Sequence, residues 1–371
     1  MNDAMPESDG NDDILWLRPV LNGVFDIEDL TSGLANGKAL RIRGRLLVPA
    51  AEAYTRLSPA FAEHHRTLLL RREQDRDVIV SLNWVNHPKP DRVWPAILLG
   101  ILTVISVLVT YMLNHVMREL SWDAFLGGIG EGLQFALALL AILLAHEMGH
   151  YLVARRFGVA VSPPYLIPLP LSPFGTMGAV IRMKGIPPSR RAMLLTGAAG
   201  PLAGLAVCVP ILIVGIMLSD VLPLPQTGSY VVEGNSVLYA GLKYLIHGQW
   251  LPSETHDLFM HPLAFAGWAG LLVTGFNLIP AGQLDGGHVA YAWLGQRARY
   301  LTWGVVGGLL LMGFLWPGWI LWGMLILLLS RGQQEPLENI TPLSSREVAL
   351  ALLLLGLFIL TITPVPLRYI N

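Results

Sequence analysis

The stretch His146-Glu147-Met148-Gly149-His150, at the end of a long apolar run, is the clearest sign of chemistry in the chain. On a helix, residues four apart share a face, so the imidazoles of His146 and His150 can bind one metal ion. Two neutral imidazoles suit Zn²⁺, and Glu147 beside them is placed to take a proton from water. Charged groups inside hydrocarbon are costly and are functional by default. The spacing therefore predicts hydrolysis of a substrate that itself lies in the membrane.

A zinc ion held by two histidines needs a third protein ligand and an open position for water. Asp285 is the candidate, because no other acid lies between Asp257 and Glu335. It follows a Pro-x-Gly stretch that breaks a helix at membrane depth. A helix N-cap is the alternative role for Asp285. The amide of Asn277 is a candidate for binding a substrate carbonyl or oxyanion, and a packing hydrogen bond is its alternative role.

The composition is that of a polytopic membrane protein. Hydrophobic residues make up 53 % of the chain, charged residues only 14 %, and the mean hydropathy is +0.53. The formal net charge of −1 gives no footprint for nucleic acid. The single cysteine, Cys208, lies in an apolar run, which indicates a small buried residue and excludes a cysteine-based zinc site. The polar, acidic N-terminus shows no signal or transit peptide pattern.

The first quarter of the chain reads as a soluble module. Residues 1–13 are polar and are expected to form a disordered tail. Residues 14–86 are expected to form a small α+β domain, and 87–92 a linker. Within the domain, residues 39–48 alternate between apolar and basic and predict a strand, and two further strands are expected at 67–72 and 78–82. Residues 49–63 predict an amphipathic helix, with Ala53, Tyr54, Leu57 and Phe61 on one face.

The rest of the chain is expected to be helical and membrane-embedded. Since a bilayer core needs about 20 apolar residues, the apolar runs predict about seven spans. They lie at about 93–113, 132–157, 192–218, 262–280, 300–316, 318–330 and 347–366. Residues 93–300 would form the catalytic core and 301–371 additional C-terminal helices.

Residues 158–191 are too proline-rich for a helix and too apolar for a solvated loop. The segment from Gly175 to Met183 looks extended. We expect a re-entrant β hairpin that lines the metal cavity, because membranes tolerate such backbone only where protein or trapped water satisfies it. A surface hairpin is the alternative.

The distribution of charge predicts the orientation. If the N-terminal domain is cytoplasmic, most basic loop residues, such as Arg155, Arg156 and Lys184, fall on the cytoplasmic side. The same orientation places the His146 turn and Asp285 toward the cytoplasmic side of the membrane. Two distant motifs thus reach the same depth, as a shared metal site requires.

These stretches resemble the motifs of the site-2 protease family of intramembrane zinc metalloproteases. His146-Glu147-x-x-His150-Tyr151, followed by Ala154-Arg155-Arg156-Phe157-Gly158, looks like the first motif. Asn277-x-x-Pro280-x-x-x-Leu284-Asp285-Gly286-Gly287 looks like the second. The resemblance covers about residues 93–300. The N-terminal α+β module and the additional C-terminal spans are similar to those of the family's bacterial and chloroplast branch. No PDZ-like or CBS-like insertion is expected, because the loop at 219–261 is too short for either.

The resemblance implies a function, regulated intramembrane proteolysis by a zinc metalloendopeptidase that acts within or near transmembrane segments. It implies one Zn²⁺ per chain on His146, His150 and Asp285, with Glu147 as catalytic base and Asn277 in contact with substrate. The segment at Gly175, Thr176, Met177 and Gly178 resembles the family's membrane-inserted β element, which would take an unwound substrate as an added strand. The expected partners are transmembrane protein substrates and lipid. The expected location is a bacterial plasma membrane rather than a chloroplast membrane. Substrate identity and oligomeric state are not indicated.

Three other functions fit parts of the pattern. A prenyl-protein-processing zinc protease would bring a glutamate as third ligand, but Glu335, Glu338 and Glu347 lie in a loop. A membrane transporter or channel would also have broken helices and intramembrane polar residues. A catalytically inactive metal-binding scaffold would keep the ligands without the activity.

Overall fold

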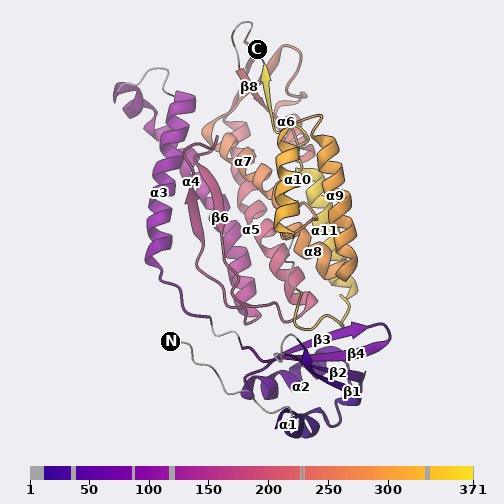
Figure 1. Ribbon diagram of the computed structural model, residues 1–371. Coiled ribbons are helices and arrows are strands. Elements are labelled where there is room, and N and C mark those ends of the chain that lie inside the picture. Colours follow the sequence, from indigo (N-terminus) through magenta and orange to yellow (C-terminus); the bar gives the residue numbers. More distant parts are fainter. Residues whose placement is uncertain are drawn as a thin grey trace. The chain divides into compact units, whose positions relative to one another are not determined.

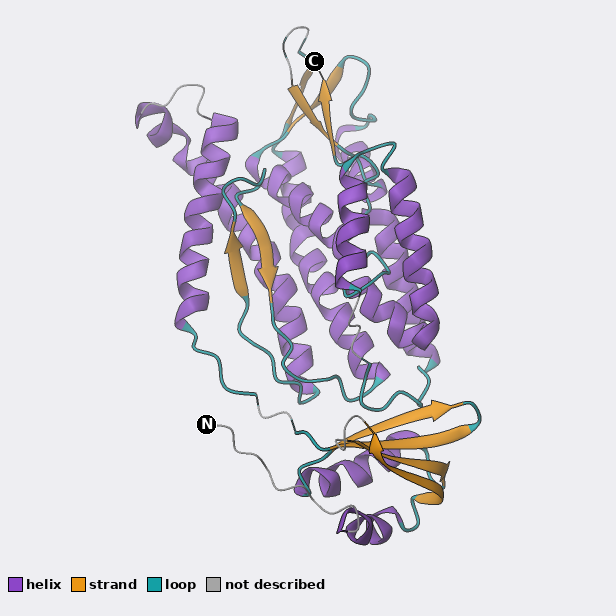
Figure 2. Cartoon of the chain, viewed as in Figure 1, coloured by secondary structure: helices purple, strands orange, loops and turns teal. Residues whose placement is uncertain are grey.

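The computed structural model describes residues 12–34, 39–85, 88–116, 122–225, 228, 230–330 and 335–370. The chain divides into two compact units (Figure 1). The first contains Met1–Lys89, Gly185–Ala192 and Gln334–Leu343, and the second contains Pro90–Lys184, Met193–Gln333 and Ser344–Asn371. The first unit is built around strands and the second around helices (Figure 2).

The first unit is an antiparallel sheet of order β1-β2-β4-β3 with two helices. Helix α2 buries Ala53, Leu57 and Phe61 in the core that it forms with the sheet, so the predicted amphipathic helix and the three strands after residue 38 are confirmed. The elements are α1 (Asp12–Leu21), β1 (Phe25–Leu34), β2 (Ala39–Leu46), α2 (Ala50–Glu63), β3 (Thr67–Glu73) and β4 (Arg76–Leu82).

Two elements of this unit were not expected. Residues 12 and 13, assigned to a disordered tail, begin α1, while residues 1–11 lie outside the described part of the chain. Strand β1, Phe-Asp-Ile-Glu-Asp-Leu-Thr-Ser-Gly-Leu, is acidic and lacks a clear alternating pattern. Its pairing with β2, from Phe25↔Leu46 to Leu34↔Ala39, therefore determines its conformation more than its own propensity does.

Two loop segments extend the sheet beyond β3. Leu70 forms a parallel bridge with Glu338, and Glu338 forms another with Ser189. Glu338 is buried, and its carboxylate accepts hydrogen bonds from the backbone amides of Ile340 and Thr341 at 2.6 and 2.7 Å. The edge of β3 is thus covered, which removes an exposed template for pairing with another chain.

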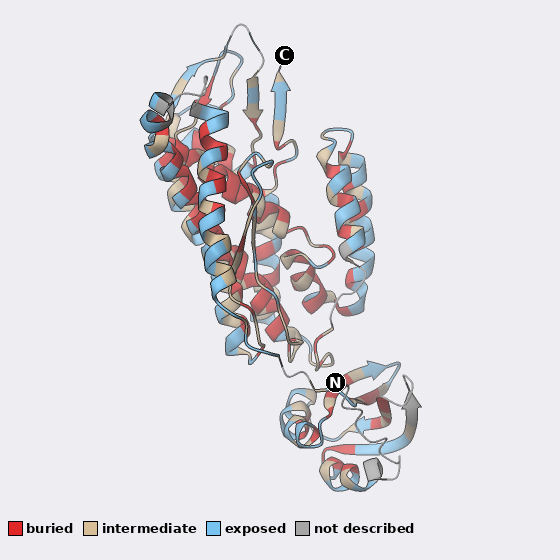
Figure 3. Cartoon of the chain, turned by 60° about the vertical axis from the view of Figure 1, so that its left-hand side comes forward, coloured by how far each residue is buried: buried red, intermediate tan, exposed pale blue. Residues whose placement is uncertain are grey.

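The second unit contains three described helices that are long and apolar enough to cross a membrane: Trp94–His115, Leu126–Arg156 and Arg190–Met217. They correspond to α3 (Trp94–Tyr111) with the π turn Met112–Val116, α4 (Trp122–Arg156) and α5 (Arg190–Met217). Exposed residues lie on the outer faces of the helices (Figure 3), and on α3 they are apolar, including Ile97, Leu98 and Ile101. Such a surface suits lipid, and the chain is a multi-pass membrane protein.

The expected total of seven spans is not shown. The four later apolar runs are helical, but they have 16, 15, 12 and 17 residues. A straight span needs about 20 residues, so these four helices are short for that role. They are α7 (Pro262–Asn277), α9 (Ala298–Met312), α10 (Gly318–Leu329) and α11 (Ser345–Thr361).

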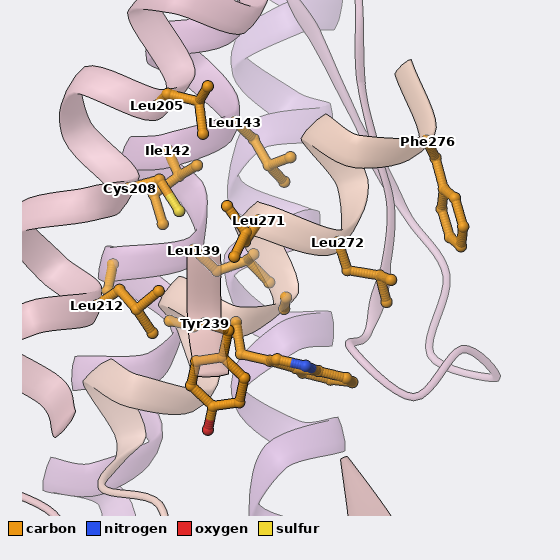
Figure 4. Packing of buried hydrophobic residues seen from close by; sticks show 14 of the residues in the cluster. Leu139, Ile142, Leu143, Leu205, Cys208, Leu212, Tyr239, Leu271, Leu272 and Phe276 are labelled. Atoms are coloured by element: carbon orange, nitrogen blue, oxygen red, sulfur yellow. The ribbon is translucent and has the colours of Figure 1, made fainter. Parts of the chain in front are cut away.

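The core of the second unit lies between α4, α5 and α7. Leu139 and Ile142 of α4 pack there with Leu205 and Cys208 of α5, and α7 contributes Leu271 and Leu272 (Figure 4). Cys208 is completely buried, as predicted, and its thiol donates to the Gly267 carbonyl at 3.1 Å. This packing holds the metal-binding helix α4 against α5.

The segment between α4 and α5 forms an antiparallel hairpin of β5 (Tyr165–Pro168) and β6 (Thr176–Val180), in contact with α3 and α4. The hydroxyl of Ser106 on α3 donates to the Gly175 carbonyl at 2.6 Å. A Cβ on Gly175 would lie 2.6 Å from the Val107 Cα, and its φ of +73° favours glycine. The expected hairpin is therefore present, fastened to α3.

Four short strands and a helix form a cap at the end of the second unit that carries the C-terminus (Figure 1). Strand β7 (Asp220–Pro223) pairs with β9 (His256–Phe259), and β8 (Tyr230–Glu233) pairs with β10 (Leu367–Ile370). Helix α6 (Val237–His247) begins at Ser236, whose side chain accepts from the Tyr239 amide. We call these five elements, with residues 234–236 and 248–255 that join them, the cap.

Candidate metal centre

The metal-binding groups of three residues, from two distant parts of the chain, meet at one point. His146 Nε2 lies 3.1 Å from Asp285 Oδ2, and His150 Nε2 lies 3.2 Å from Asp285 Oδ1. The two Nε2 atoms are 3.2 Å apart. The histidines project from one face of α4, and Asp285 is the first residue of α8 (Asp285–Leu294). The three residues form a group that could hold a metal ion.

The spacing of these donors fits zinc. Tetrahedral coordination with bonds of about 2.05 Å places neighbouring ligand atoms about 3.3 Å apart. The observed separations of 3.1–3.2 Å are close to that value. Two imidazoles and one carboxylate leave a fourth position for water, as in catalytic rather than structural zinc sites.

The protonation of His150 is determined by its neighbour. Its Nδ1 lies 2.7 Å from the Thr196 carbonyl on α5. A carbonyl only accepts, so Nδ1 carries the hydrogen in the neutral ring and Nε2 presents a lone pair. This contact orients the imidazole toward the other two donors, as outer hydrogen bonds do in metal sites.

Small residues of α5 make room for both imidazoles. A Cβ on Gly200 would lie 2.0 Å from His150 Nε2, and one on Gly204 would lie 3.1 Å from His146 Nδ1. Likewise, a Cβ on Gly149 would lie 2.4 Å from the Ala199 carbonyl oxygen. The glycine-rich run of α5 thus packs closely against the metal-bearing helix, as small residues allow. The glycines accommodate the ligands as well as the helix backbone.

Glycines also shape the turn that carries Asp285. A Cβ on Gly286 would lie 2.1 Å from the Leu278 carbonyl oxygen, and one on Gly287 would lie 2.3 Å from that of Gly282. Gly282 itself has a φ of +60°. The chain therefore folds back on itself between α7 and α8 and directs Asp285 inward. Leu284, not Asp285, is the N-cap of α8, which argues against the alternative role of Asp285 as a helix cap.

Glu147 and Asn277 lie at the edge of this group. Glu147 is buried, with 8 % of its surface exposed, and the backbone amide of Ile181, just after β6, is within hydrogen-bonding reach of its carboxylate. Asn277 is the last residue of α7, and its Nδ2 lies 3.5 Å from His146 Nε2. The structure thus brings both residues to the point where the donors meet.

The four hairpin residues expected to bind substrate differ from one another in burial and in their contacts. Thr176 is buried and donates to the Ile167 carbonyl at 2.8 Å, whereas Met177 is 71 % exposed. Gly175 forms the turn against α3, and Gly178 has a φ of +109°. No hydrogen bond found among the described residues joins these four to the metal donors. Only the continuation of β6, at Ile181, reaches Glu147.

Comparison with known proteins finds a family model that matches the part of the chain around the metal centre. Residues 134–313, which include both motifs, match the model of peptidase family M50.

Over these residues the chain is similar to peptidase family M50.

Among known proteins, the chain is similar to "Probable zinc metalloprotease EGY2, chloroplastic" of Arabidopsis thaliana. The two are 30 % identical over 88 % of this chain and 60 % of the relative. The protein of the same name from Oryza sativa subsp. indica is 31 % identical over 92 % of this chain and 65 % of its own length. "Probable zinc metalloprotease EGY1, chloroplastic" of Arabidopsis thaliana is 35 % identical over 64 % and 44 %. The chain thus spans less than two thirds of the length of these relatives. No solved structure matches.

Proposed function

We propose that this chain is an intramembrane zinc metalloendopeptidase that cleaves peptide bonds within or near transmembrane segments of other membrane proteins. One observation carries the proposal: the Nε2 atoms of His146 and His150 lie 3.2 Å apart, and each lies 3.1–3.2 Å from one carboxylate oxygen of Asp285. The histidines belong to a helix apolar enough to cross a membrane, and Glu147 adjoins them. Similarity to family M50 over residues 134–313 supports the same activity.

The residues divide the chemistry among them. A zinc ion held by His146, His150 and Asp285 would acidify water and polarise the scissile carbonyl. Glu147 accepts the proton of the attacking water and returns it to the leaving amine. The Asn277 amide donates a hydrogen bond to the developing oxyanion, a contribution of about 3 kcal/mol when such a donor is preorganised. Burial of the site excludes competing water.

The hairpin supplies a surface for the substrate. Strand β6 pairs with β5 in a sheet of two strands, so one edge of β6 is left for an added strand. An unwound substrate segment would pair with this edge along Thr176, Met177 and Gly178, beyond the turn at Gly175. Because the chain just after β6 reaches Glu147, a substrate in this register approaches the catalytic base.

The wider architecture is proposed as follows. Seven spans cross the membrane, and residues 14–86 form a soluble domain joined by a linker at 87–92 to a catalytic core at 93–300. Residues 301–371 add the C-terminal helices. The relatives are named as chloroplastic proteins, so the comparisons give no support to the bacterial plasma membrane expected from the sequence. We propose the orientation alone, with the N-terminal domain and the active site on the cytoplasmic side or its topological equivalent.

The proposal is tested by incubating the purified full chain with single-span membrane proteins. We expect cleavage that stops in the Glu147→Gln variant and in the presence of a zinc chelator. The variant should retain one zinc per chain, because Gln replaces a residue that is not a ligand. Cleavage that persists in Glu147→Gln would exclude Glu147 as the base, and a transporter or inactive scaffold would show no cleavage in either form.

A further inference from the structure

The cap contains a second cluster of buried ionisable groups, far along the chain from the metal donors. The ammonium of Lys243, completely buried, lies 3.6 Å from Glu233 Oε1 and 4.4 Å from the centre of the Tyr239 ring. The Tyr239 hydroxyl donates to the same Glu233 oxygen at 3.1 Å. Asp257 on β9 is also buried and interacts electrostatically with Lys243. Three cap elements, β8, α6 and β9, therefore meet in one charged cluster.

The charges of this cluster do not balance. Two carboxylates and one ammonium give a net charge of −1 when all three are ionised. A buried charge without a partner is costly, and the cost disappears if the carboxylates take up one proton. Burial raises the pKa of Glu233 and of Asp257 above their ordinary values, in agreement with this count. Burial also lowers the pKa of Lys243, although both carboxylates oppose that shift.

Few other charged groups face the cluster. A cavity of about 320 Å³ is lined by Glu233 and Asp257 together with Tyr111 and His115 at the end of the α3 segment, and by Phe265 of α7. A second cavity, of about 410 Å³, is lined by Glu233 and Arg368 of β10. Tyr239 remains protonated, because burial raises its pKa well above 10. Trp268 of α7, which donates to the Gly234 carbonyl at 2.9 Å, is uncharged.

We propose that the cap is a proton-responsive lid, closed when Glu233 and Asp257 share one proton and loosened when both are ionised. Loosening separates β8, α6 and β9 around an uncompensated carboxylate. The 320 Å³ cavity that Glu233 and Asp257 line extends to the end of the α3 segment. There the stacked rings of Tyr111 and His115 have centroids 4.9 Å apart. This inference does not depend on the activity proposed above.

The direction of the pH dependence follows from linkage. An acid whose pKa is higher in the closed cap than in the open cap binds its proton more tightly in the closed form. Its contribution to closure is complete below the ordinary carboxyl pKa of about 4 and is lost as pH rises through the raised value. Acid therefore closes the cap, and alkaline pH loosens it.

Hydrogen–deuterium exchange of the zinc-loaded full chain tests the lid. Labelling at pH 5.5, 7.0 and 8.5, with times scaled to the intrinsic exchange rate, should show increasing deuterium uptake in β8 and β9. The opening constant should rise by up to about tenfold per pH unit between the ordinary carboxyl pKa and the raised pKa and level off above it, since one proton is linked to closure. The paired strands β2 and β4 serve as the internal control and should show no such change after scaling.

Two variants decide the assignment. The double variant Glu233→Gln, Asp257→Asn keeps the size of both side chains and should remove the pH dependence, leaving the cap protected at pH 8.5. The exposed cap residue Glu254 provides the matched control, and Glu254→Gln should retain the wild-type dependence. A wild-type cap whose scaled uptake is the same at all three pH values would overturn the proposal. So would a double variant that keeps the wild-type slope.

Discussion

The metal centre and the cap cluster are both buried groups of ionisable side chains in the same helical unit, but they obtain positive charge in different ways. In the cap, Lys243 lies 3.6 Å from Glu233 and supplies the cation itself. Around Asp285, the partners found among the described residues are two imidazoles, each accepting or donating according to its protonation. A site whose donors converge with no lysine among them is suited to binding a metal ion. A cluster that already contains a lysine ammonium is suited to binding a proton.

The packing around the two clusters differs as well. The metal donors lie against glycines of α5, so that a single added methyl group would collide with an imidazole. In α6 of the cap, a Cβ on Gly241 would meet nothing within 4 Å. The backbone also approaches closely beside Glu233, where a Cβ on Gly234 would lie 1.9 Å from the Val365 carbonyl oxygen, but the nearest atoms there belong to no ionisable side chain.

The largest expected effect is that of removing a donor. Asp285→Ala should lower zinc content from one per chain toward zero and abolish cleavage, because a lost ligand should cost more than the 10–100-fold in affinity typical of an outer hydrogen bond. Asp257→Ala also removes a buried carboxylate, but from the cap, and should retain the metal. Metal analysis of both purified variants checks the difference. Equal zinc in the two would exclude Asp285 as a ligand.

Removal of the Asn277 amide should act on catalysis without removing the metal. We expect Asn277→Ala to lower kcat by about 10²–10³, the loss typical of a missing oxyanion donor. Asn235 of the cap, whose amide donates to the Leu251 carbonyl, provides a matched control, and Asn235→Ala should leave kcat unchanged. Unchanged kcat in Asn277→Ala, with zinc bound, would leave Asn277 only a packing role.

Removal of the cap's own cation should act on stability. Lys243→Met leaves Glu233 and Asp257 without a counter-charge and should destabilise the closed cap by about 3 kcal/mol at pH 8. The loss should be smaller at pH 5.5, where proton uptake neutralises part of the charge, since the pKa of each acid is raised in the folded cap. Exchange rates of cap amides measure the change, and zinc content should be unaffected. An equal loss at both pH values would contradict the charge count.

The smallest expected effect is that of adding a methyl group to a glycine beside each cluster. Gly200→Ala places a methyl group 2.0 Å from His150 Nε2 and should lower zinc affinity by about 10–100-fold by displacing the ring. Gly241→Ala on α6 has free space and should stabilise the helix by about 0.5–1 kcal/mol without altering zinc binding. Competition with a chelator measures both affinities. Wild-type affinity in Gly200→Ala would show that α5 can move away from His150.

The parts of the fold that could be predicted are those with a local signal. The three strands and the helix between Ala39 and Leu82 have periodic patterns, and α3 to α5 are long apolar runs. Strand β1 was missed because its acidic sequence needs β2 as a partner. The sheet extension through Glu338 and Ser189 was missed because it joins segments far apart in the chain, with no pattern in either.

The sequence by itself determined the chemistry of the site. His146, Glu147 and His150 share a helix turn, so their proximity follows from the helical repeat. Asp285 could be named because it stood alone among the acids of a long apolar stretch. The family resemblance rested on the same residues.

The tertiary structure decided what surrounds those residues. Thr196 orients His150, Gly200 makes room for it, and Lys243 of α6 lies 3.6 Å from Glu233 of β8. None of these contacts follows from spacing along the chain. They arise because distant backbone segments pack at a few ångströms, and a sequence encodes such distances only through the complete fold.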